Sequence, residues 1–307
     1  MKKIYFLDTV HSVLKERLTR AGYVCFDLSG EKKENIMPLV RDAHGLVIRS
    51  RITLNREFLK TINDLCFIAR SGSGLENIDL EYCKKNQIKV YNSPEGNKDA
   101  VAEHCLGMLI SLINNFKNAH KDLTRGLWIR EKNRGVEISS QKVAIIGYGH
   151  NGRAFAHRLS AMGAKVLAYD KYKTGFSTEN IQESPLEEIF LNASVVSFHV
   201  PLTEETRYMA DYQFFKRFVQ PVYVLNISRG GVLNTSDLIQ AIDDGVVLGA
   251  GLDVLDEENK SFGVEERNKT IIKLNERPNV IITPHVAGWT KESYYKLSLI
   301  LAQKVLN

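Results

Sequence analysis

One segment decides the fold of this 307-residue chain: Val143-Ala144-Ile145-Ile146-Gly147-Tyr148-Gly149-His150-Asn151-Gly152. Its first four residues form an apolar strand-like run, and its last six match the pattern G-x-G-x-x-G. The helix-like stretch Arg153–Met162 follows, and a second apolar run then ends in Asp170, 18 residues after the last glycine. This order of strand, glycine turn, helix and second strand with a terminal carboxylate is the full context of a dinucleotide-binding unit.

Each glycine of the pattern has an expected task. Gly147 allows the tight turn, Gly149 lets the backbone approach a pyrophosphate, and Gly152 lets helix and strand pack closely. The phosphates would bind at the helix N-terminus, where unpaired N–H groups and the helix dipole favour anions. The alternative interpretation is a structural glycine-rich turn without a ligand.

The residue at the end of the second strand bears on the choice of cofactor. The carboxylate of Asp170 can accept hydrogen bonds from ribose hydroxyls and repels a 2′-phosphate, so the sequence favours NAD over NADP. Lys171 and Lys173 follow directly and weaken this preference.

Outward from this segment, short apolar runs alternate with longer amphipathic stretches, which predicts parallel sheets covered by helices on both faces. The runs expected as strands are Ile4–Asp8, Gly45–Arg49, Cys66–Arg70, Ile88–Asn92, Lys142–Gly147, Lys165–Asp170, Ser194–His199, Val222–Ile227, Val247–Asp253 and Val280–Thr283. The clearest helix-like stretches are His11–Ala21, Asn77–Asn86, Gly152–Met162 and Thr235–Asp243. So many strands exceed one compact domain.

The predicted fold class is therefore α/β, with two doubly wound parallel-sheet domains: a flavodoxin-like substrate domain and a Rossmann cofactor domain, with a cleft between them. The boundary is placed at a long apolar helical pattern, Lys98–Lys117. We expect residues 98–286 to form the NAD-binding domain. Residues 1–97 and 287–307 would form the discontinuous substrate domain, closed by a terminal helix over Thr290–Asn307.

Composition excludes several classes of protein. Lys and Arg number 41 and Asp and Glu 36, a net charge of +5 that is too small and too dispersed for a dedicated nucleic-acid binder. The four cysteines form no C-x-x-C pair, and Cys25 and Cys66 lie in apolar runs, which predicts buried thiols in a reducing compartment. The eight histidines show no metal-binding spacing, so no metal is expected. No signal peptide or long apolar span is evident, so we expect a cytoplasmic protein without membrane partners.

Residues of chemical interest recur at the carboxyl ends of the strand-like runs, where open parallel sheets bind ligands. They include Arg49, Arg70, Ser71, Asn92, Gly147, Asp170, His199, Arg229, Asp253 and His285. The alternative is that polar residues follow strands because loops are polar. That accounts for a few positions, but less readily for the recurrence of Arg, Asp and His.

Four further segments give these positions a common identity. They are Ser197–Thr203, Leu225–Gly231, Ala250–Glu258 and Ile282–Thr290. Together with the glycine motif, they resemble the D-isomer-specific 2-hydroxyacid dehydrogenases over essentially the whole chain.

The resemblance implies a catalytic set of Arg229, Glu258 and His285. The chemistry is coherent, because reduction of a 2-keto acid needs a hydride donor, a proton donor and a carboxylate clamp. The planar guanidinium of Arg229 can bind the carboxylate and polarise the carbonyl. His285 can give or take the hydroxyl proton, and Glu258 would orient its imidazole. Asn259 replaces the family's usual proline, and the charged segment Lys260–Lys273 is expected as a surface insertion.

The resemblance also assigns the cofactor contacts, in which Asp253 would hold the nicotinamide carboxamide. His199 is expected to be mainly a pocket or structural residue. The complete expected NAD-binding set is Gly147, Gly149, His150, Asn151, Gly152, Asp170, Val200, Pro201, Ile227, Asp253 and Gly288.

The first domain bears on the substrate. Segments 47–51, 69–74 and 92–97 look like the substrate loops of phosphoglycerate dehydrogenases, in which the backbone of Ser71, Gly72 and Ser73 would receive the substrate carboxylate. The phosphate would then face Arg49, Arg70, Asn97 and, across a homodimer interface, Arg130. The alternative is that the loop arginines are simply solvated.

The expected reaction is therefore the NAD-dependent interconversion of 3-phosphoglycerate and 3-phosphohydroxypyruvate, the entry to serine synthesis. Because the chain stops after the terminal helix, no regulatory domain or serine feedback is expected. Two alternatives stay open: a glyoxylate or hydroxypyruvate reductase, and a dinucleotide-sensing partner-binding protein similar to the C-terminal-binding corepressors of the same fold.

Overall fold

The computed structural model describes residues 1–258 and 268–307, so most of the predicted charged insertion, and Asn259, lie outside the described residues. The chain divides into two compact units. The first contains Met1–Lys98 and Trp289–Asn307, and the second contains Asp99–Glu258 and the described residues up to Gly288. These divisions fall one and two residues later along the chain than the predicted boundaries.

The first unit is built on a five-stranded parallel sheet. Its strand order is β2-β1-β3-β4-β5, the flavodoxin-like order. The strands are β1 (Lys3–Phe6), β2 (Val24–Asp27), β3 (Gly45–Ile48), β4 (Phe67–Arg70) and β5 (Lys89–Asn92). The helices are α1 (Ser12–Arg20), α2 (Lys33–Leu39), α3 (Arg56–Leu59), α4 (Leu80–Lys85) and α12 (Lys291–Leu306).

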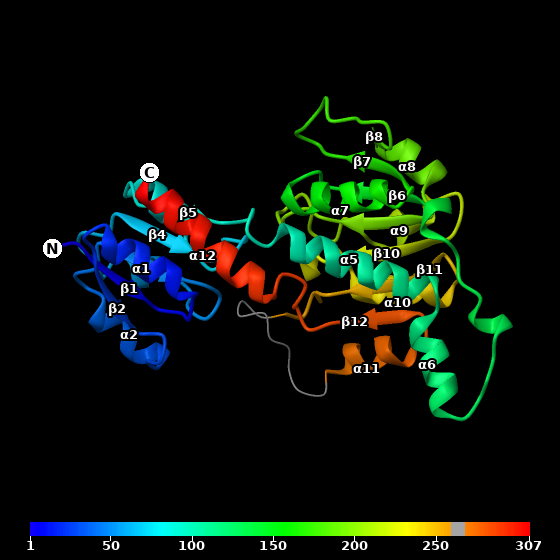
Figure 1. Cartoon of the computed structure of the whole chain (residues 1–307), viewed down its shortest axis with the longest axis horizontal. Coiled ribbons are helices and arrows are strands. Elements are labelled where there is room, and N and C mark those ends of the chain that lie inside the picture. The colour runs from blue at the N-terminus through cyan, green and yellow to red at the C-terminus, as the bar shows by residue number, and fades with distance from the viewer. Residues whose placement is uncertain (259–267) are drawn as a thin grey trace. The chain divides into compact units, whose positions relative to one another are not determined.

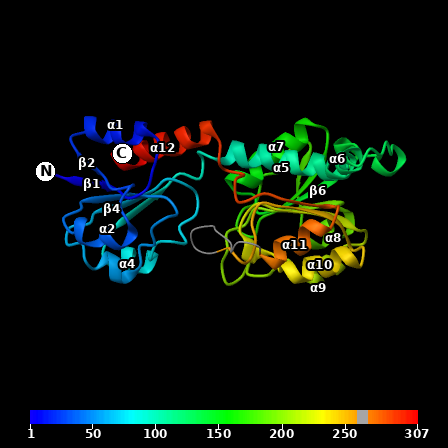
Figure 2. The same cartoon turned by 90° about the horizontal axis from the view of Figure 1, so that it is seen from below.

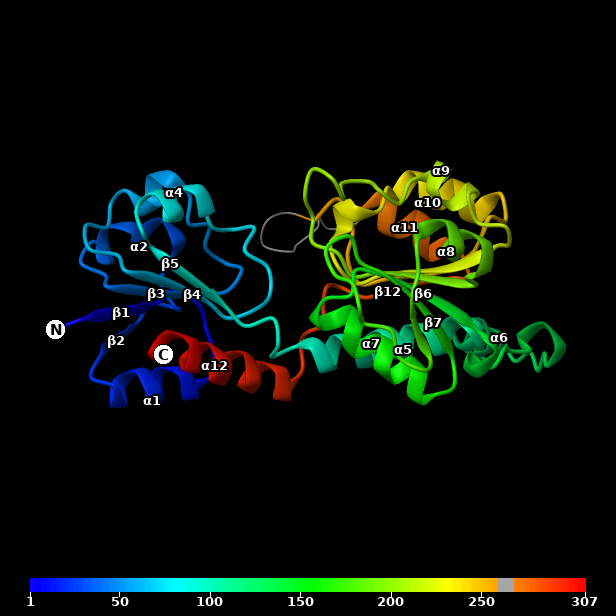
Figure 3. The ribbon, with the colours of Figure 1, turned by 90° about the horizontal axis from the view of Figure 1, so that it is seen from above.

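Both faces of this sheet are buried, because alternate side chains of a strand point to opposite faces. Ile4 and Phe6 pack in a cluster with side chains of α1 and α12. Tyr5 and Leu7 pack in a second cluster with side chains of α2, α3 and α4. Figures 2 and 3 show α1 and α12 on one face of the sheet and α2 and α4 on the other.

The second unit is built on a seven-stranded parallel sheet of order β12-β11-β10-β9-β6-β7-β8. The strands are β6 (Lys142–Ile146), β7 (Lys165–Tyr169), β8 (Ile181–Glu183), β9 (Val195–Phe198), β10 (Val222–Asn226), β11 (Val247–Leu252) and β12 (Val280–Ile282). The α-helices are α5 (Lys98–Ile113), α6 (Phe116–Thr124), α7 (His150–Ala161), α8 (Leu186–Asn192), α9 (Tyr212–Lys216), α10 (Thr235–Asp243) and α11 (Lys269–Glu276), with short 3₁₀ turns η1 (Glu131–Asn133), η2 (Ile138–Ser140) and η3 (Gly230–Val232). This is the Rossmann order extended by one strand, as predicted.

Alternation again places the helices of this unit. Val143 and Ile145 of β6 pack with α5 and α7, while Ala144 and Ile146 pack with the side of the sheet that α8, α9, α10 and α11 cover. Figure 1 shows the strands of this sheet side by side, and Figure 3 shows the two helical layers on its opposite faces.

All ten predicted runs overlap a strand, but β2 and β8 were not predicted. Both are short edge strands, and β2 is at best half-buried. The long helical pattern from Lys98 is divided into α5 and α6, because Asn115 adopts a left-handed backbone with φ of 53°.

The burial of the cysteines was predicted wrongly. Cys66 is exposed and Cys25 is only partly buried, whereas Cys83 and Cys105 are buried. The side chains of Leu65 and Phe67 on either side of Cys66 point into the core, so the side chain of Cys66 points to solvent. No helix among the described residues has both the length and the apolar character needed to cross a bilayer.

Candidate active site

The order of the larger sheet defines where a ligand binds. β6 lies between β7 and β9, so the connections leave β6 in opposite directions and the strand order reverses there. In open α/β sheets, ligands bind beyond the carboxyl ends of the strands at such a switch point. The fingerprint follows β6 directly, and three predicted polar loops follow the neighbouring strands β10, β11 and β12.

The glycine turn after β6 has the close approaches that the pattern predicts. Gly147 has a φ of 99°, and its N–H donates to the carbonyl of Tyr169 at 2.8 Å. A Cβ atom on Gly147 would lie 2.8 Å from the carbonyl oxygen of His199. A Cβ atom on Gly152 would lie 2.0 Å from the carbonyl oxygen of Gly147. Side chains at either position would therefore push the turn apart.

The surroundings of Gly149 fit a bound dinucleotide. No atom lies within 4 Å of the position of a Cβ on Gly149, and this residue is the N-cap of α7 without any side-chain cap. The first N–H groups of α7 are thus left to bind an anion. Asn151 Oδ1 and His199 Nδ1 are buried below this turn and have no hydrogen-bond partner among the described residues. His150, the first helical residue, is exposed.

Asp170 lies at the end of β7, where it can receive a ribose. Its carboxylate accepts the N–H groups of Tyr148 at 2.8 Å and Tyr172 at 3.0 Å. The two lysines that follow are engaged elsewhere, because Lys171 pairs with Glu205 and Lys173 donates to the carbonyl of Tyr148. Both ammonium groups therefore have partners in this structure.

His285 and Glu258 form a direct pair. The Nδ1 atom of His285 lies 2.6 Å from Glu258 Oε2, and both side chains are largely buried. The other carboxylate oxygen of Glu258 accepts the N–H of Leu255 at 2.6 Å. His285 has a φ of 54°, which is strained for a residue with a side chain. The backbone N–H of His285 donates to the carbonyl of Asp253 at 2.8 Å, and this hydrogen bond stabilises the left-handed conformation.

Arg229 follows β10 in a loop shaped by a buried amide. The side chain of Asn226 donates to the carbonyl of Arg229 at 3.0 Å and accepts from the Ser228 hydroxyl at 2.9 Å. A Cβ on the next residue, Gly230, would lie 1.8 Å from the carbonyl oxygen of Leu255. The loop of Arg229 therefore packs directly on the loop whose Leu255 binds Glu258, and the structure brings the three predicted catalytic residues into one cluster of loops.

Asp253 organises the loop that carries His285. Its Oδ1 accepts the Thr283 hydroxyl at 2.5 Å and the N–H of Val286 at 2.9 Å. Its Oδ2 accepts the N–H of Ala287 at 2.8 Å. Asp253 is 2% exposed, so this carboxylate is a buried anchor with several donors.

The remaining residues of the expected NAD-binding set lie on the loops after β9, β10 and β12. The Val200 side chain approaches the glycine turn, where its Cγ1 would lie 2.9 Å from a Cβ on Gly147. The Pro201 carbonyl accepts the Thr206 hydroxyl at 2.6 Å. Ile227 is buried, and Gly288 is partly buried at the end of the second unit.

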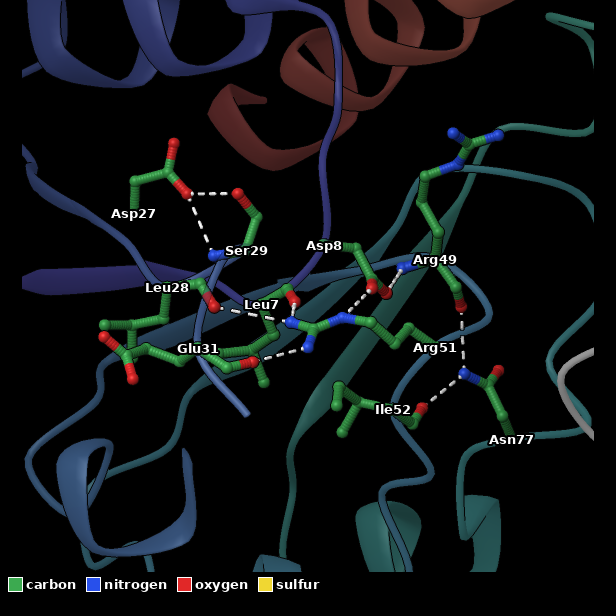
Figure 4. Close-up of polar contacts among 10 residues, drawn as sticks. All are labelled: Leu7, Asp8, Asp27, Leu28, Ser29, Glu31, Arg49, Arg51, Ile52 and Asn77. Atoms are coloured by element: carbon green, nitrogen blue, oxygen red, sulfur yellow. Dashed lines mark hydrogen bonds and ion pairs between the residues drawn. The ribbon is translucent and has the colours of Figure 1, made fainter. Parts of the chain in front are cut away.

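In the first unit, two neighbouring arginines after β3 differ sharply. Arg51 donates from Nε to Asp8 at 3.0 Å and from Nη1 to the Glu31 carbonyl at 2.8 Å, and it also binds the carbonyl of Leu7. Figure 4 shows its guanidinium among these acceptors, whereas the Arg49 side chain extends away from them. Arg49 joins this hydrogen-bond network only through its backbone, whose N–H donates to the Asp8 carboxylate.

The Arg49 guanidinium lies against aromatic rings instead. It is 4.3 Å from the centroid of the Trp289 ring and 5.6 Å from that of Tyr294. Burial lowers the pKa of Arg49. Among the described residues, no hydrogen bond or ion pair of its guanidinium is found. Trp289 was not among the predicted substrate residues, although it lies in the segment Ile282–Thr290 and immediately before the predicted terminal helix.

The other predicted substrate residues lie at the ends of β4 and β5. Arg70 is buried, and a Cβ on Gly72 would lie 1.6 Å from its Nη1, so the guanidinium packs under the loop backbone. The Ser73 hydroxyl donates to Asn97 Oδ1 at 2.8 Å. The Ser71 hydroxyl is buried, with no hydrogen-bond partner among the described residues.

Arg130 belongs to the second unit, where it is exposed beside η1. It borders an open concavity with Asp122, Leu127, Trp128 and other residues of α6 and the following loop. Among the described residues, no group of three or more His, Cys, Asp or Glu side chains is arranged to hold a metal ion.

Residues 106–287 match the family model described as the D-isomer specific 2-hydroxyacid dehydrogenase, NAD binding domain. The chain belongs to this family. The match confirms the family expected from the sequence, its character as an NAD-dependent oxidoreductase and NAD as its cofactor.

Three relatives show what the family match leaves open. The chain is 30% identical over 276 residues to the hydroxypyruvate reductase of Thermotoga maritima, covering 89% of this chain and 87% of that protein. It is 32% identical over 304 residues to D-3-phosphoglycerate dehydrogenase 2 of Saccharomyces cerevisiae, covering 97% and 65%. The crystal structure of D-lactate dehydrogenase from Aquifex aeolicus with NAD and lactic acid has a TM-score of 0.84 and 27% identity, over 99% and 94% of the two chains.

These relatives are named for different substrates, so the family does not decide the substrate of this chain. The chain also spans only about half to two thirds of the length of several phosphoglycerate dehydrogenases that it matches, between 52% and 66%.

Proposed function

We propose that this chain interconverts 3-phosphoglycerate and 3-phosphohydroxypyruvate with NAD. The observation that carries the choice of substrate is the Arg49 guanidinium, which has no acceptor among the described residues, whereas Arg51 beside it donates from all three guanidinium nitrogens. A guanidinium presents five N–H donors in a rigid fork that suits a phosphate. A short unphosphorylated acid needs only one group to bind its carboxylate, so it would leave the Arg49 guanidinium without a ligand.

The surroundings of Arg49 make it a stronger anion site than a solvated arginine. Its guanidinium lies over the rings of Trp289 and Tyr294, which favour its positive charge without accepting its N–H groups in conventional hydrogen bonds. Burial disfavours its charge, as the lowered pKa shows, and a dianionic phosphate would offset this cost. A charge-assisted hydrogen bond in such partly dry surroundings is about twice as strong as a neutral one.

The catalytic chemistry belongs to Arg229, Glu258 and His285. NAD, when bound, supplies the hydride acceptor. Because His285 Nδ1 is held by Glu258, Nε2 is the ring nitrogen that takes the proton of the substrate hydroxyl in oxidation and returns it in reduction. The guanidinium of Arg229 binds the substrate carboxylate and polarises the carbonyl that forms.

A second candidate is reduction of glyoxylate or hydroxypyruvate. It is favoured by the Thermotoga maritima hydroxypyruvate reductase, of whose length this chain covers 87%. In that reaction Arg49 would have no phosphate to bind.

The test is oxidation of NADH by the purified protein with 3-phosphohydroxypyruvate, hydroxypyruvate and glyoxylate in parallel. We expect the largest kcat/KM for the phosphorylated acid. A preference for either of the others would overturn the phosphate assignment and keep the dehydrogenase. The protein could instead bind NADH but turn over none of the three acids, with the affinity for NADH unchanged in His285→Ala. That result would support the dinucleotide-sensing alternative.

We also propose that two copies of the chain associate through the segment 116–136 of the second unit. Six of its large apolar side chains are exposed: Phe116, Leu123, Leu127, Trp128, Ile129 and Val136. An exposed apolar patch of this kind marks an interaction surface. Arg130 lies on the same segment, so its proposed contact with a substrate depends on this association.

A further inference from the structure

A histidine outside the proposed catalytic set contacts the loop of His285. His104 belongs to α5, and its Nε2 atom lies 2.9 Å from the Oγ1 atom of Thr283. The Thr283 hydroxyl in turn lies 2.5 Å from Asp253 Oδ1. His104 Nε2 is also 3.7 Å from that carboxylate oxygen, whose side chain is 1% exposed. Three side chains thus form a line that ends on a buried carboxylate.

The direction of these hydrogen bonds follows from counting protons. A threonine hydroxyl has one proton to donate. An oxygen 2.5 Å from a carboxylate oxygen places that proton between the two, since their lone pairs would otherwise repel. Thr283 therefore accepts from His104, and His104 carries a proton on Nε2.

A count of acceptor positions shows that the Asp253 carboxylate can accept one more hydrogen bond from a ligand. A carboxylate has about four acceptor positions. Oδ1 already receives Thr283 and the N–H of Val286. Among the residues that the structure describes, Oδ2 receives one donor, the N–H of Ala287. One lone pair of Oδ2 is left for a donor from outside the chain.

We propose that His104 is a positioning residue for the nicotinamide end of the cofactor. Through Thr283 it fixes the rotation of the Asp253 carboxylate, so that the remaining lone pair of Oδ2 meets the N–H of a carboxamide. The inference rests on the proposed role of Asp253 in holding that group.

The position of His104 on α5 explains why backbone donors alone are not enough. Val286 and Ala287 belong to the loop of His285, so they hold the carboxylate relative to that loop only. Helix α5 has eight buried side chains and packs in the core of the unit. His104 thereby ties the carboxylate to the rigid core and not only to its own loop.

The experiment measures dissociation constants for three probes by titration: NADH, reduced 3-acetylpyridine adenine dinucleotide and ADP-ribose. The acetylpyridine analogue has a methyl ketone in place of the carboxamide and offers no N–H, and ADP-ribose lacks the nicotinamide. We expect the intact protein to bind NADH about tenfold more tightly than the analogue, as for one hydrogen bond to a charged group. In His104→Leu this ratio should fall toward one, with ADP-ribose affinity unchanged.

Rescue and control variants separate positioning from folding. His104→Gln keeps an N–H donor and should restore most of the ratio, and His157→Leu, at an exposed histidine of α7, should leave it unchanged. If His104→Leu does not fold, judged by lost ADP-ribose binding, Thr283→Val should lower the ratio and Thr283→Ser should keep it. An unchanged ratio in His104→Leu overturns the role of His104 alone. Equal binding of NADH and the analogue by the intact protein overturns the role of Asp253 as well.

Discussion

At the scale of single residues, the buried imidazole of His199 makes the stability of the folded chain depend on pH. Its ring is buried against Phe155, with Nε2 bonded to the Ser197 hydroxyl at 2.9 Å. Burial lowers the pKa of His199 from 6.5 to about 4. The folded protein therefore holds this histidine neutral over a range where the unfolded chain binds a proton.

The sign of the effect is a loss of stability in acid. Because the folded pKa is depressed, the contribution is complete above pH 6.5 and is lost as the pH falls toward 4. We predict that His199→Gln lowers the pH dependence of the free energy of unfolding between pH 6 and 4.5, by up to about 1.4 kcal/mol per pH unit. Urea unfolding of the cofactor-free protein across this range measures it. Equal slopes for both proteins, with His157→Gln as an exposed control, would contradict it.

Residues that define motifs could be predicted from the sequence, and their partners only in part. Arg229, Glu258 and His285 lie in ordered segments with a known spacing, and the structure brings these loops together. The pairing of Arg49 with Trp289 joins residues 240 positions apart, which no local pattern specifies. The hydrogen bonds of Arg51 to backbone carbonyls could not be predicted either, because nothing in the local sequence distinguishes Arg51 from Arg49.

At the scale of elements, α12 places the ring of Tyr294 beside Arg49 within the first unit. The helix begins after a capping box of Thr290 and Ser293, and its first turn holds Tyr294. Lys304, near its end, binds both carboxylate oxygens of Glu95 at 2.9 Å. These contacts fix the position of the helix, so Trp289, directly before it, stands at a defined place beside Arg49.

We predict that Trp289→Leu raises the KM for 3-phosphohydroxypyruvate with little change in kcat. Loss of one cation–π contact worth about 0.5–2 kcal/mol corresponds to a rise of about two- to thirtyfold. Trp289→Phe should restore most of the affinity. Tyr295→Leu is the matched control, because Tyr295 packs on His11 and not on Arg49. An equal rise of KM for hydroxypyruvate would contradict a role through the phosphate site.

The central strands of both sheets form continuous apolar runs and were predicted. Of the four edge strands, β5 and β12 were predicted as well, and β2 and β8 were missed. The division of the long helix at Asn115 depends on one left-handed residue, and asparagine is among the few that adopt this conformation readily.

At the scale of the whole molecule, the proposed homodimer depends on the segment 116–136. Trp128 is 80% exposed, and burial of its large apolar surface against a partner chain would favour association. We predict that the protein sediments with twice the mass of one chain and that Trp128→Glu shifts it to a monomer. Val219→Glu, at a 71% exposed valine outside this segment, is the control. A monomer at micromolar concentration without any substitution would contradict the proposed association.

Binding of a phosphate by the Arg49 guanidinium can be measured by comparing two substrates that differ only in the phosphate group. The measurement is kcat/KM for 3-phosphohydroxypyruvate divided by kcat/KM for hydroxypyruvate, in the natural protein, in Arg49→Met and in Arg56→Met, an exposed arginine of α3. We predict a ratio well above one that falls about 10- to 100-fold in Arg49→Met, as for loss of charge-assisted hydrogen bonds, and stays unchanged in Arg56→Met. A ratio at or below one in the natural protein, or one that Arg49→Met leaves unchanged, would contradict this role of Arg49.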